Sequence, residues 1–277
     1  MRFRSVVFCC VSCLVRVLVQ LRSAAFIYLK NLTKAEDDNL IFRASDATLE
    51  TIKSSLLHAF EHENDDKLRM RLLYTSCAFA GTLVPLRKWD AFFPTLFGYA
   101  RSNNTRLREF SMRIVAVLTR DLTGFMRDNI STMLELLSGA LNDQQPSVRA
   151  AALDVYSAFL VLIEDNNVRQ TLAQMLPVVL GGIMAALHEG AEESAQIGID
   201  ALTSVAENDP LFLKRHATDF INGMLDIAQS AQLQITTRRL AVEFIVSLYE
   251  SRASLVRRTP NVLQRLMPVE RVCVAVR

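Results

Sequence analysis

The sequence is short of the residues that build metal sites and cross-links. It has 1 tryptophan, 9 glycines, 7 prolines, 4 histidines and 5 cysteines among 277 residues. Such low glycine and proline counts exclude collagen-like and low-complexity chains. Cys10 and Cys13 form a C-x-x-C motif, but no second pair or histidine cluster stands at metal-ligand spacing. We therefore expect the cysteines at positions 9, 10, 13, 77 and 273 to be packing thiols that form no disulfide framework and bind no metal. This usage is typical of a reduced, intracellular protein.

The sequence also has no large excess of positive or negative charge and none of the motifs of common enzymes. Lys and Arg number 31 against 29 Asp and Glu, a net charge of +2, which is not typical of nucleic-acid or membrane-surface binders. No segment of strand period stands out, and G-x-S-x-G, a Walker lysine and H-E-x-x-H are absent. We therefore expect no enzyme, no cofactor and no direct contact with nucleic acid or membrane.

What the sequence does contain is a helical pattern that returns. The hydrophobic fraction of 51% is enough for a continuous core. The clearest copy starts at Pro146-Ser147-Val148-Arg149, where a polar turn precedes a proline suited to the first position of a helix. Apolar residues then follow at the spacing of one helical face, at positions 152, 155, 156, 159 and 163. This stretch predicts a helix that is buried along one side.

Six segments share this register when each is aligned on one polar residue. The aligned positions are 22, 69, 108, 149, 196 and 238, so the steps between them are 47, 39, 41, 47 and 42 residues. This period is typical of two-helix repeats of the HEAT or armadillo kind. The sequence therefore predicts an all-α, right-handed α-solenoid of about six HEAT repeats, each an antiparallel helix pair.

The repeat array is predicted to span residues 20–268. Residues 1–19 are apolar and follow Arg2 and Arg4, which fits either the first helix of a partial repeat or a targeting signal, since Ser23-Ala24-Ala25 resembles a cleavage site. A third interpretation is that the array has a different natural start. Residues 269–277 differ from the predicted second helices, which indicates a divergent or truncated tail. We interpret the chain as part of a longer solenoid.

The repeated arginine has a structural interpretation. Arg69, Arg108, Arg149 and Arg238 stand in the first turns of the second helices, where a guanidinium can reach acceptors in the turn of its own or the adjacent repeat. A ladder of such contacts would tie neighbouring repeats together. The alternative is an arginine stripe that binds phosphate or acidic peptide. Because glutamine replaces arginine at Gln196, we expect the ladder to be weakest between the fourth and fifth copies.

Candidate protein-binding residues are polar side chains on the exposed side of the second helices. They are Arg113, Asp154, Glu193, Glu243 and Glu250. In a curved array the second helices line the concave surface, where one partner can touch several repeats. A solvated helix face is the alternative interpretation of each residue.

Several phrases resemble importin-beta-type nuclear transport receptors. First helices with Phe93-Pro94 and Leu176-Pro177 alternate with second helices that begin with Val-Arg or Leu-Arg. Residues 238–250 (RRLAVEFIVSLYE), followed by Thr259-Pro260-Asn261, are similar to the amino-terminal part of the karyopherin beta-3 (importin-5) branch. The resemblance covers roughly residues 21–268. The last phrase is fairly specific, whereas Leu107-Arg108-Glu109 and Pro146-Ser147-Val148-Arg149 are generic to HEAT repeats.

The resemblance implies a nuclear import receptor that moves between cytoplasm and nucleus. Its implied partners are the GTP form of the GTPase Ran, protein cargo with basic localisation signals, and Phe-Gly nucleoporins. Members of this family are several times longer than 277 residues. The alternative is a HEAT scaffold of a multiprotein complex that does not bind Ran.

Overall fold

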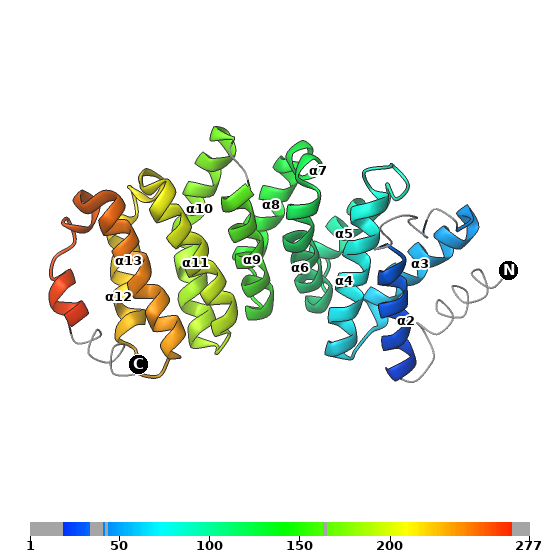
Figure 1. Cartoon of the computed structure of the whole chain (residues 1–277), viewed down its shortest axis with the longest axis horizontal. Helices are drawn as coiled ribbons and strands as arrows, with labels where there is room; N and C mark the ends of the chain where they lie inside the picture. Colours follow the sequence, from blue (N-terminus) through cyan, green and yellow to red (C-terminus); the bar gives the residue numbers. More distant parts are fainter. Residues whose placement is uncertain (1–18, 34–40, 42–43, 163–164, 268–277) are drawn as a thin grey trace. The chain divides into compact units, whose positions relative to one another are not determined.

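The computed structural model describes residues 19–33, 41, 44–162 and 165–267. These residues form helices and turns and no β-strand (Figure 1). The chain divides into two compact units, Met1–Leu122 and Thr123–Arg277. The predictions for residues 1–18 and 269–277 lie outside the described residues, as do Cys9, Cys10, Cys13 and Cys273.

The described part of unit 1 contains five α-helices, α2 (Val19–Leu32), α3 (Asp46–His62), α4 (Asp66–Leu83), α5 (Phe92–Ala100) and α6 (Thr105–Asp121). The second helices α2, α4 and α6 each carry one of the aligned polar residues. Helix α4 packs against α2 and against the first helix α3 of its own repeat, and α6 packs against α4 and α5. The unit is therefore a stack of helix pairs, as the sequence period predicts.

Unit 2 repeats this arrangement. Its helices are α7 (Thr123–Asp128), α8 (Ile130–Leu141), α9 (Pro146–Leu162), α10 (Asn166–His188), α11 (Glu192–Asn208), the 3₁₀ helix η2 (Pro210–Leu213), α12 (Ala217–Gln229) and α13 (Ile235–Val256). The second helices α9, α11 and α13 lie side by side (Figure 1). The first helix α8 packs on α9, α10 packs on both α9 and α11, and α12 packs on α13.

The positions that the repeat register predicts to be apolar are the positions that form the buried core. In each of the six copies, four apolar or small positions follow the aligned polar residue at the same offsets. All of these positions are buried except Tyr28, which is half-buried. Burial of one face against the neighbouring helices supplies the main stabilisation, since each buried large apolar side chain contributes about 1.5–3 kcal/mol. The six-copy all-α prediction is confirmed.

Local sequence signals mark three of the helix starts. Pro146 is the first residue of α9, as predicted. Ser45 caps α3 by accepting a hydrogen bond from the Thr48 amide, and Asp65, in the turn between α3 and α4, caps α4 in the same way at the Leu68 amide. Such caps satisfy backbone N–H groups that have no partner within the helix.

The first helix of the third repeat begins late. The apolar spacing from Pro85 onward favours a helix, but α5 begins only at Phe92. The intervening residues form turns, and Arg87 has φ 53°, a left-handed conformation that an α-helix cannot include. Trp89 lies before the helix but is buried. Its burial extends the apolar pattern of α5 toward the N-terminus, so the sequence pattern alone looks like a longer helix.

Helix α10 is long and apolar enough to span a bilayer by length and composition. It nevertheless contacts α8, α9, α11 and α12, and Leu172, Leu176 and Ile183 are fully buried in the unit 2 core. Core helices of soluble proteins pass the same test of length and composition. Its apolar character is accounted for by this packing.

Candidate interaction surfaces and the links between repeats

Arg149 joins the fourth repeat to the fifth. Its Nη1 donates to the carbonyl oxygens of Asp143, at 2.8 Å, and Gln144, at 3.1 Å, in the turn before its own helix. Its Nη2 donates to the carboxylate of Glu189, in the turn of the next repeat. The guanidinium fork thus holds two successive turns, a geometry suited to arginine because its donors are fixed in one plane.

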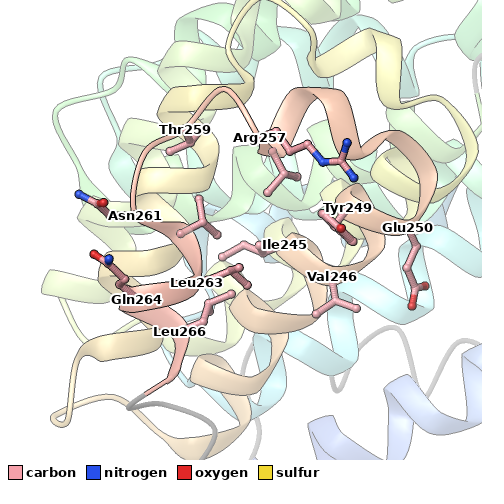
Figure 2. Close-up of a pocket in the computed structure, with 12 residues that line it drawn as sticks. Ile245, Val246, Tyr249, Glu250, Arg257, Thr259, Asn261, Leu263, Gln264 and Leu266 are labelled. Atoms are coloured by element: carbon pink, nitrogen blue, oxygen red, sulfur yellow. The ribbon is translucent and has the colours of Figure 1, made fainter.

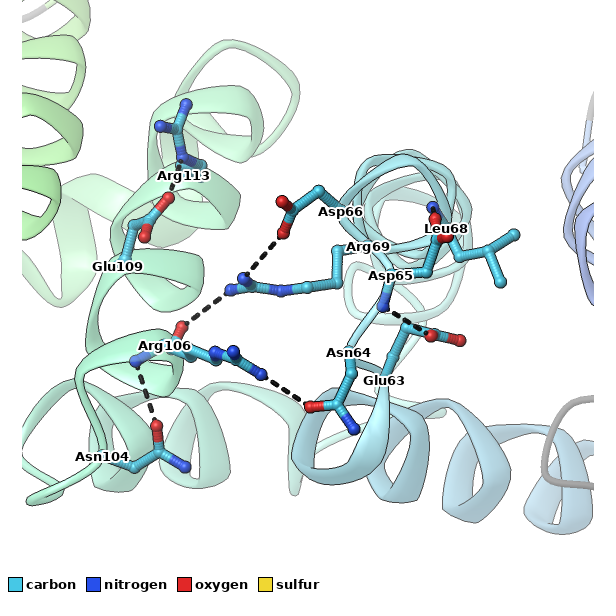
Figure 3. Close-up of polar contacts among 10 residues, drawn as sticks. All are labelled: Glu63, Asn64, Asp65, Asp66, Leu68, Arg69, Asn104, Arg106, Glu109 and Arg113. Atoms are coloured by element: carbon cyan, nitrogen blue, oxygen red, sulfur yellow. Dashed lines mark hydrogen bonds and ion pairs between the residues drawn. The ribbon is translucent and has the colours of Figure 1, made fainter. Parts of the chain in front are cut away.

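Arg69 makes the corresponding link in unit 1. Its Nη2 donates to the backbone oxygen of Arg106, at 3.2 Å, and its Nη1 lies 3.6 Å from Asp66 (Figure 3). Arg106 in turn donates from Nη1 to the side-chain oxygen of Asn64 at 2.6 Å. Figure 3 shows that these contacts connect the turn before α4 with the start of α6.

The other two predicted arginines each donate to a carbonyl oxygen of their own repeat. Arg108 donates from Nη1 to the Ser102 carbonyl oxygen at 3.0 Å, in the turn before α6. Arg238 is buried and donates from Nε to the Ala228 carbonyl oxygen at 2.9 Å, at the end of α12. All four arginines therefore donate to backbone carbonyls in or beside turns, and their contribution to stability stays a prediction.

The glutamine in the fifth copy also reaches its neighbour. Gln196 donates from Nε2 to the Thr237 hydroxyl at 2.9 Å, and Thr237 donates to Glu192. Because Arg149 pairs with Glu189, the fourth and fifth copies are joined by an ion pair. The expectation that the ladder is weakest between these two copies stays a prediction.

Three ion pairs between repeats were not foreseen from the sequence. They join Arg22 to Glu63, Arg169 to Asp209 and Arg265 to Asp226. Their sequence separations are 41, 40 and 39 residues, which match the repeat period. A search for opposite charges one period apart could therefore have found them.

The five candidate protein-binding residues do not form one cluster. Glu193 on α11 and Glu243 and Glu250 on α13 are exposed in unit 2, whereas Asp154 on α9 is half-buried. Arg113 lies in unit 1, where its Nε donates to Glu109 at 2.9 Å (Figure 3). The helix pair α11 and α13 thus carries the exposed members of the set.

Exposed carboxylates are present on both of the adjoining second helices α11 and α13. On α11, Glu193, Asp200 and Glu207 are exposed and seven residues apart, so they share one side of the helix. Glu243 and Glu250 have the same spacing on α13, which packs directly on α11. We name these five carboxylates the acidic face. It can attract a cationic segment lying across both helices.

A largely apolar groove of about 700 Å³ lies between α13 and the chain that follows it (Figure 2). We name it the α13 groove. The backbone leaves helical geometry at Arg252 (φ −153°, ψ 67°), and Asn261 adopts a left-handed conformation that asparagine tolerates. Residues 262–267 then form a helical turn. Its lining includes Val246, Tyr249, Thr259, Val262, Leu263 and Leu266.

One polar group of the α13 groove has no partner among the residues that the structure describes. Thr259 is 4% exposed, and its hydroxyl makes no hydrogen bond to any of those residues. Buried hydroxyls are normally bonded, because leaving one unsatisfied costs about 1–3 kcal/mol. Tyr249 and Leu263 are 47% and 77% exposed. The groove therefore combines open apolar surface with an unmet hydrogen-bonding group.

The strongest pKa shifts belong to groups that are structural. Burial raises the pKa of the Cys77 thiol and of the Tyr156 phenol well above their ordinary values, and Tyr156 donates to the Leu172 carbonyl oxygen. Burial also raises the pKa of Tyr99, with a hydrogen bond to Glu61 adding to the effect. These groups lie apart in the helix pairs, and residues 19–33, 41, 44–162 and 165–267 contain no cluster of three potential metal ligands.

Comparisons with known proteins agree with this repeat architecture. A family model described as "IPO5-like, TPR repeats" matches residues 65–223. The name refers to TPR units, although the steps of 39–47 residues between positions 22, 69, 108, 149, 196 and 238 exceed the 34 residues of such a unit. A probable importin-5 homolog from Dictyostelium discoideum is 22% identical over 241 residues, which is 86% of this chain. The chain spans only 22% of that relative's length.

Solved structures show the same fold. Kap121p bound to Nup53p has a TM-score of 0.74 and 19% identity, over 96% of this chain and 25% of the other. Kap121p bound to the extreme C-terminus of the protein phosphatase Cdc14p has a TM-score of 0.75 and 19% identity, over 98% and 26%. The family model covers more than half of the residues, and on this ground the chain belongs to the IPO5-like family of importin-beta-type karyopherins.

Proposed function

We propose that the chain acts as part of a nuclear transport receptor and that the acidic face binds basic segments of protein cargo. The carrying observation is the placement of Glu193, Asp200 and Glu243 on adjoining second helices with exposed side chains. A cationic peptide laid across α11 and α13 would meet several carboxylates at once, which raises its association rate and affinity.

The structural neighbours support a protein ligand. Solved structures show Kap121p bound to Nup53p, Cdc14p, Ste12p and Pho4p. We extend this behaviour to the present chain as part of the proposal, and with it the GTP form of Ran and Phe-Gly nucleoporins as further partners. Location in both cytoplasm and nucleus belongs to the same proposal.

The cargo proposal is tested with a fluorescent lysine- and arginine-rich peptide. Charge reversal by Asp200→Lys with Glu243→Lys should weaken peptide binding roughly tenfold, or about 1.4 kcal/mol, and high salt should weaken binding to the unaltered chain. The control is Asp219→Lys, an exposed acid on the first helix α12, which is compared with Asp200→Lys alone because each changes the net charge by the same amount. Equal losses in both variants would show only a general charge effect and would refute the assignment to the acidic face.

The Ran part of the proposal has a separate test. A pull-down with Ran loaded with GTP or with GDP should retain the GTP form alone. Equal retention, or none, would remove Ran from the proposal and leave cargo binding to be judged by the peptide measurement.

A further inference from the structure

One face of helix α4 is open to solvent. Four exposed residues of this helix follow one another at helical intervals, Lys67, Met70, Arg71 and Tyr74. This spacing places them on one side of the helix. Met70 and Tyr74 are large apolar side chains that are 40% and 45% exposed. Because α4 packs on both α2 and α6, the open face belongs to an inner helix of unit 1.

Contacts with the two neighbouring second helices fix where this face points. On one side, Arg69 donates to the backbone oxygen of Arg106 on α6, at 3.2 Å. On the other side, Thr75 donates to the backbone oxygen of Phe26 on α2, at 3.1 Å. Successive residues of an α-helix are rotated by about 100°. The open face of α4 therefore points between these two contacts, on the side opposite the buried core.

Helix α6 carries cations in the same register. Arg106 and Arg113 lie seven residues apart, so they share one side of α6. In the repeat alignment Arg106 takes the position of Lys67, and Arg113 takes that of Tyr74. Because α4 and α6 are adjoining second helices, their two rows of side chains lie on the same side of the pair. Figure 3 shows both arginines on α6, where Arg113 bonds to Glu109 at 2.9 Å.

Helix α2 adds a cation beside the exposed tyrosine. The ammonium of Lys30 lies 5.0 Å from the centre of the Tyr74 ring, which is the geometry of a cation–π contact. Cations of three successive second helices thus accompany the two exposed apolar side chains. We name this set the basic patch, and its members are Lys30, Lys67, Met70, Arg71, Tyr74, Arg106 and Arg113.

The second helices of the basic patch differ in charge from α11. Helix α4 carries three cationic residues against one acidic residue, and α6 carries four against two. Helix α11 carries four acidic residues and no cationic residue. In the repeat alignment Arg113 and Arg120 stand at the positions of Glu243 and Glu250, two members of the acidic face. The same register therefore presents opposite charges in the two units.

We propose that the basic patch binds an acidic protein segment that also carries apolar side chains. Carboxylates of the segment pair with Lys67, Arg71 and Arg113, which gives the charge complementarity of a specific contact. An apolar side chain of the segment packs on Met70 and Tyr74. Exposed apolar surface rimmed by polar groups marks protein-binding sites, and methionine adapts to partners of different shape. The proposal is independent of the acidic face and of Ran binding.

The surroundings of Tyr74 favour a protein segment over single-stranded nucleic acid. An exposed aromatic ring among cations also binds nucleic acid when bases stack on the ring. Lys30 lies over the ring of Tyr74, so a base cannot stack on that face. An aliphatic side chain requires only the open part of the ring and the neighbouring Met70.

The experiment measures the fluorescence anisotropy of a labelled, glutamate-rich peptide that carries leucine and phenylalanine. A matched peptide has serine in place of these apolar residues, and the chain should bind it roughly tenfold more weakly. Lys67→Glu with Arg71→Glu should weaken binding of the first peptide by at least about tenfold. The control, Lys214→Glu with Arg215→Glu, changes the net charge equally at exposed positions of unit 2 and should weaken binding by less than about twofold.

A second pair of variants tests the apolar part of the basic patch without a change of charge. Tyr74→Ala should weaken binding of the leucine- and phenylalanine-containing peptide by about five- to tenfold. Tyr249→Ala, at a tyrosine of similar exposure on α13, should leave this binding unchanged. Circular dichroism checks that each variant is folded.

Four results would overturn the proposal. They are no binding of the glutamate-rich peptide to the unaltered chain, equal binding of the two peptides, equal effects of the two charge-reversed variants, and equal effects of the two tyrosine variants. Polyuridylate serves as the nucleic-acid probe. If its binding depends on Tyr74 as strongly as peptide binding does, the basic patch is a nucleic-acid site and the proposal is likewise overturned.

Discussion

Replacement of Arg149 by alanine removes three contacts at one point. The guanidinium donates to two carbonyl oxygens of its own turn and to Glu189 in the next repeat. The arginine side chain is 19% exposed and that of Glu189 is 32% exposed. These contacts therefore lie at a partly solvated boundary between repeats, where screening reduces the ion pair more than the carbonyl bonds.

The expected loss of stability follows from these contacts. A hydrogen bond to a charged group contributes about 1.5–3 kcal/mol, and a solvent-exposed ion pair contributes roughly 0.2–1 kcal/mol. Water can reach the exposed Gln144 turn and recover part of the loss. We therefore expect Arg149→Ala to lower the free energy of unfolding by about 1–3 kcal/mol, and Tm by about 2–4 °C for each kcal/mol.

Urea denaturation followed by circular dichroism measures this change. The control is Arg239→Ala, an exposed arginine on α13, which should change stability by less than about 0.5 kcal/mol. Glu189→Gln should cost less than Arg149→Ala, because it leaves the two carbonyl bonds intact. The structural interpretation fails if Arg149→Ala is as stable as Arg239→Ala. Lost partner binding at unchanged stability would instead favour an arginine stripe that contacts ligands.

Two further predictions concern packing and ionisation. Gly139 on α8 has no neighbouring atom within 4 Å of the position that an added Cβ would occupy. Gly139→Ala should therefore raise the free energy of unfolding, measured in urea, by about 0.5–1 kcal/mol. Gly198→Ala should raise it less, because its added Cβ would lie 3.2 Å from Ile183. Cys77 should resist iodoacetamide in the native state and react on unfolding, as measured by peptide mass spectrometry, because burial raises its pKa above 9.0. Only the unfolded state ionises this thiol above pH 9, so its contribution to stability is full below that pH and falls as pH rises. Rapid native labelling, or a Gly198→Ala protein stabilised as much as the Gly139→Ala protein, would contradict these predictions.

Much of the fold could be predicted because the information is local. Apolar spacing predicts which face of each helix is buried, and Pro146, Ser45 and Asp65 mark helix starts within a few residues of where they act. The candidate site was less predictable. The exposed side of a helix follows from its register, which placed Glu193, Glu243 and Glu250 correctly on exposed positions. The half-burial of Asp154 and the pairing of Arg113 with Glu109 depend on neighbouring side chains.

The sequence by itself determined the six-copy helical register and the buried positions, because a repeat packs only on its neighbours and its period is written in apolar residues. Tertiary structure alone decided which acceptor each polar residue meets. Arg149 reaches the next repeat whereas Arg238 bonds within its own, since turn length and helix rotation set the reach of a side chain. It also decided the α13 groove, which depends on the backbone conformations of Arg252 and Asn261. Those conformations arise from packing across the chain, and no spacing of residue types encodes them.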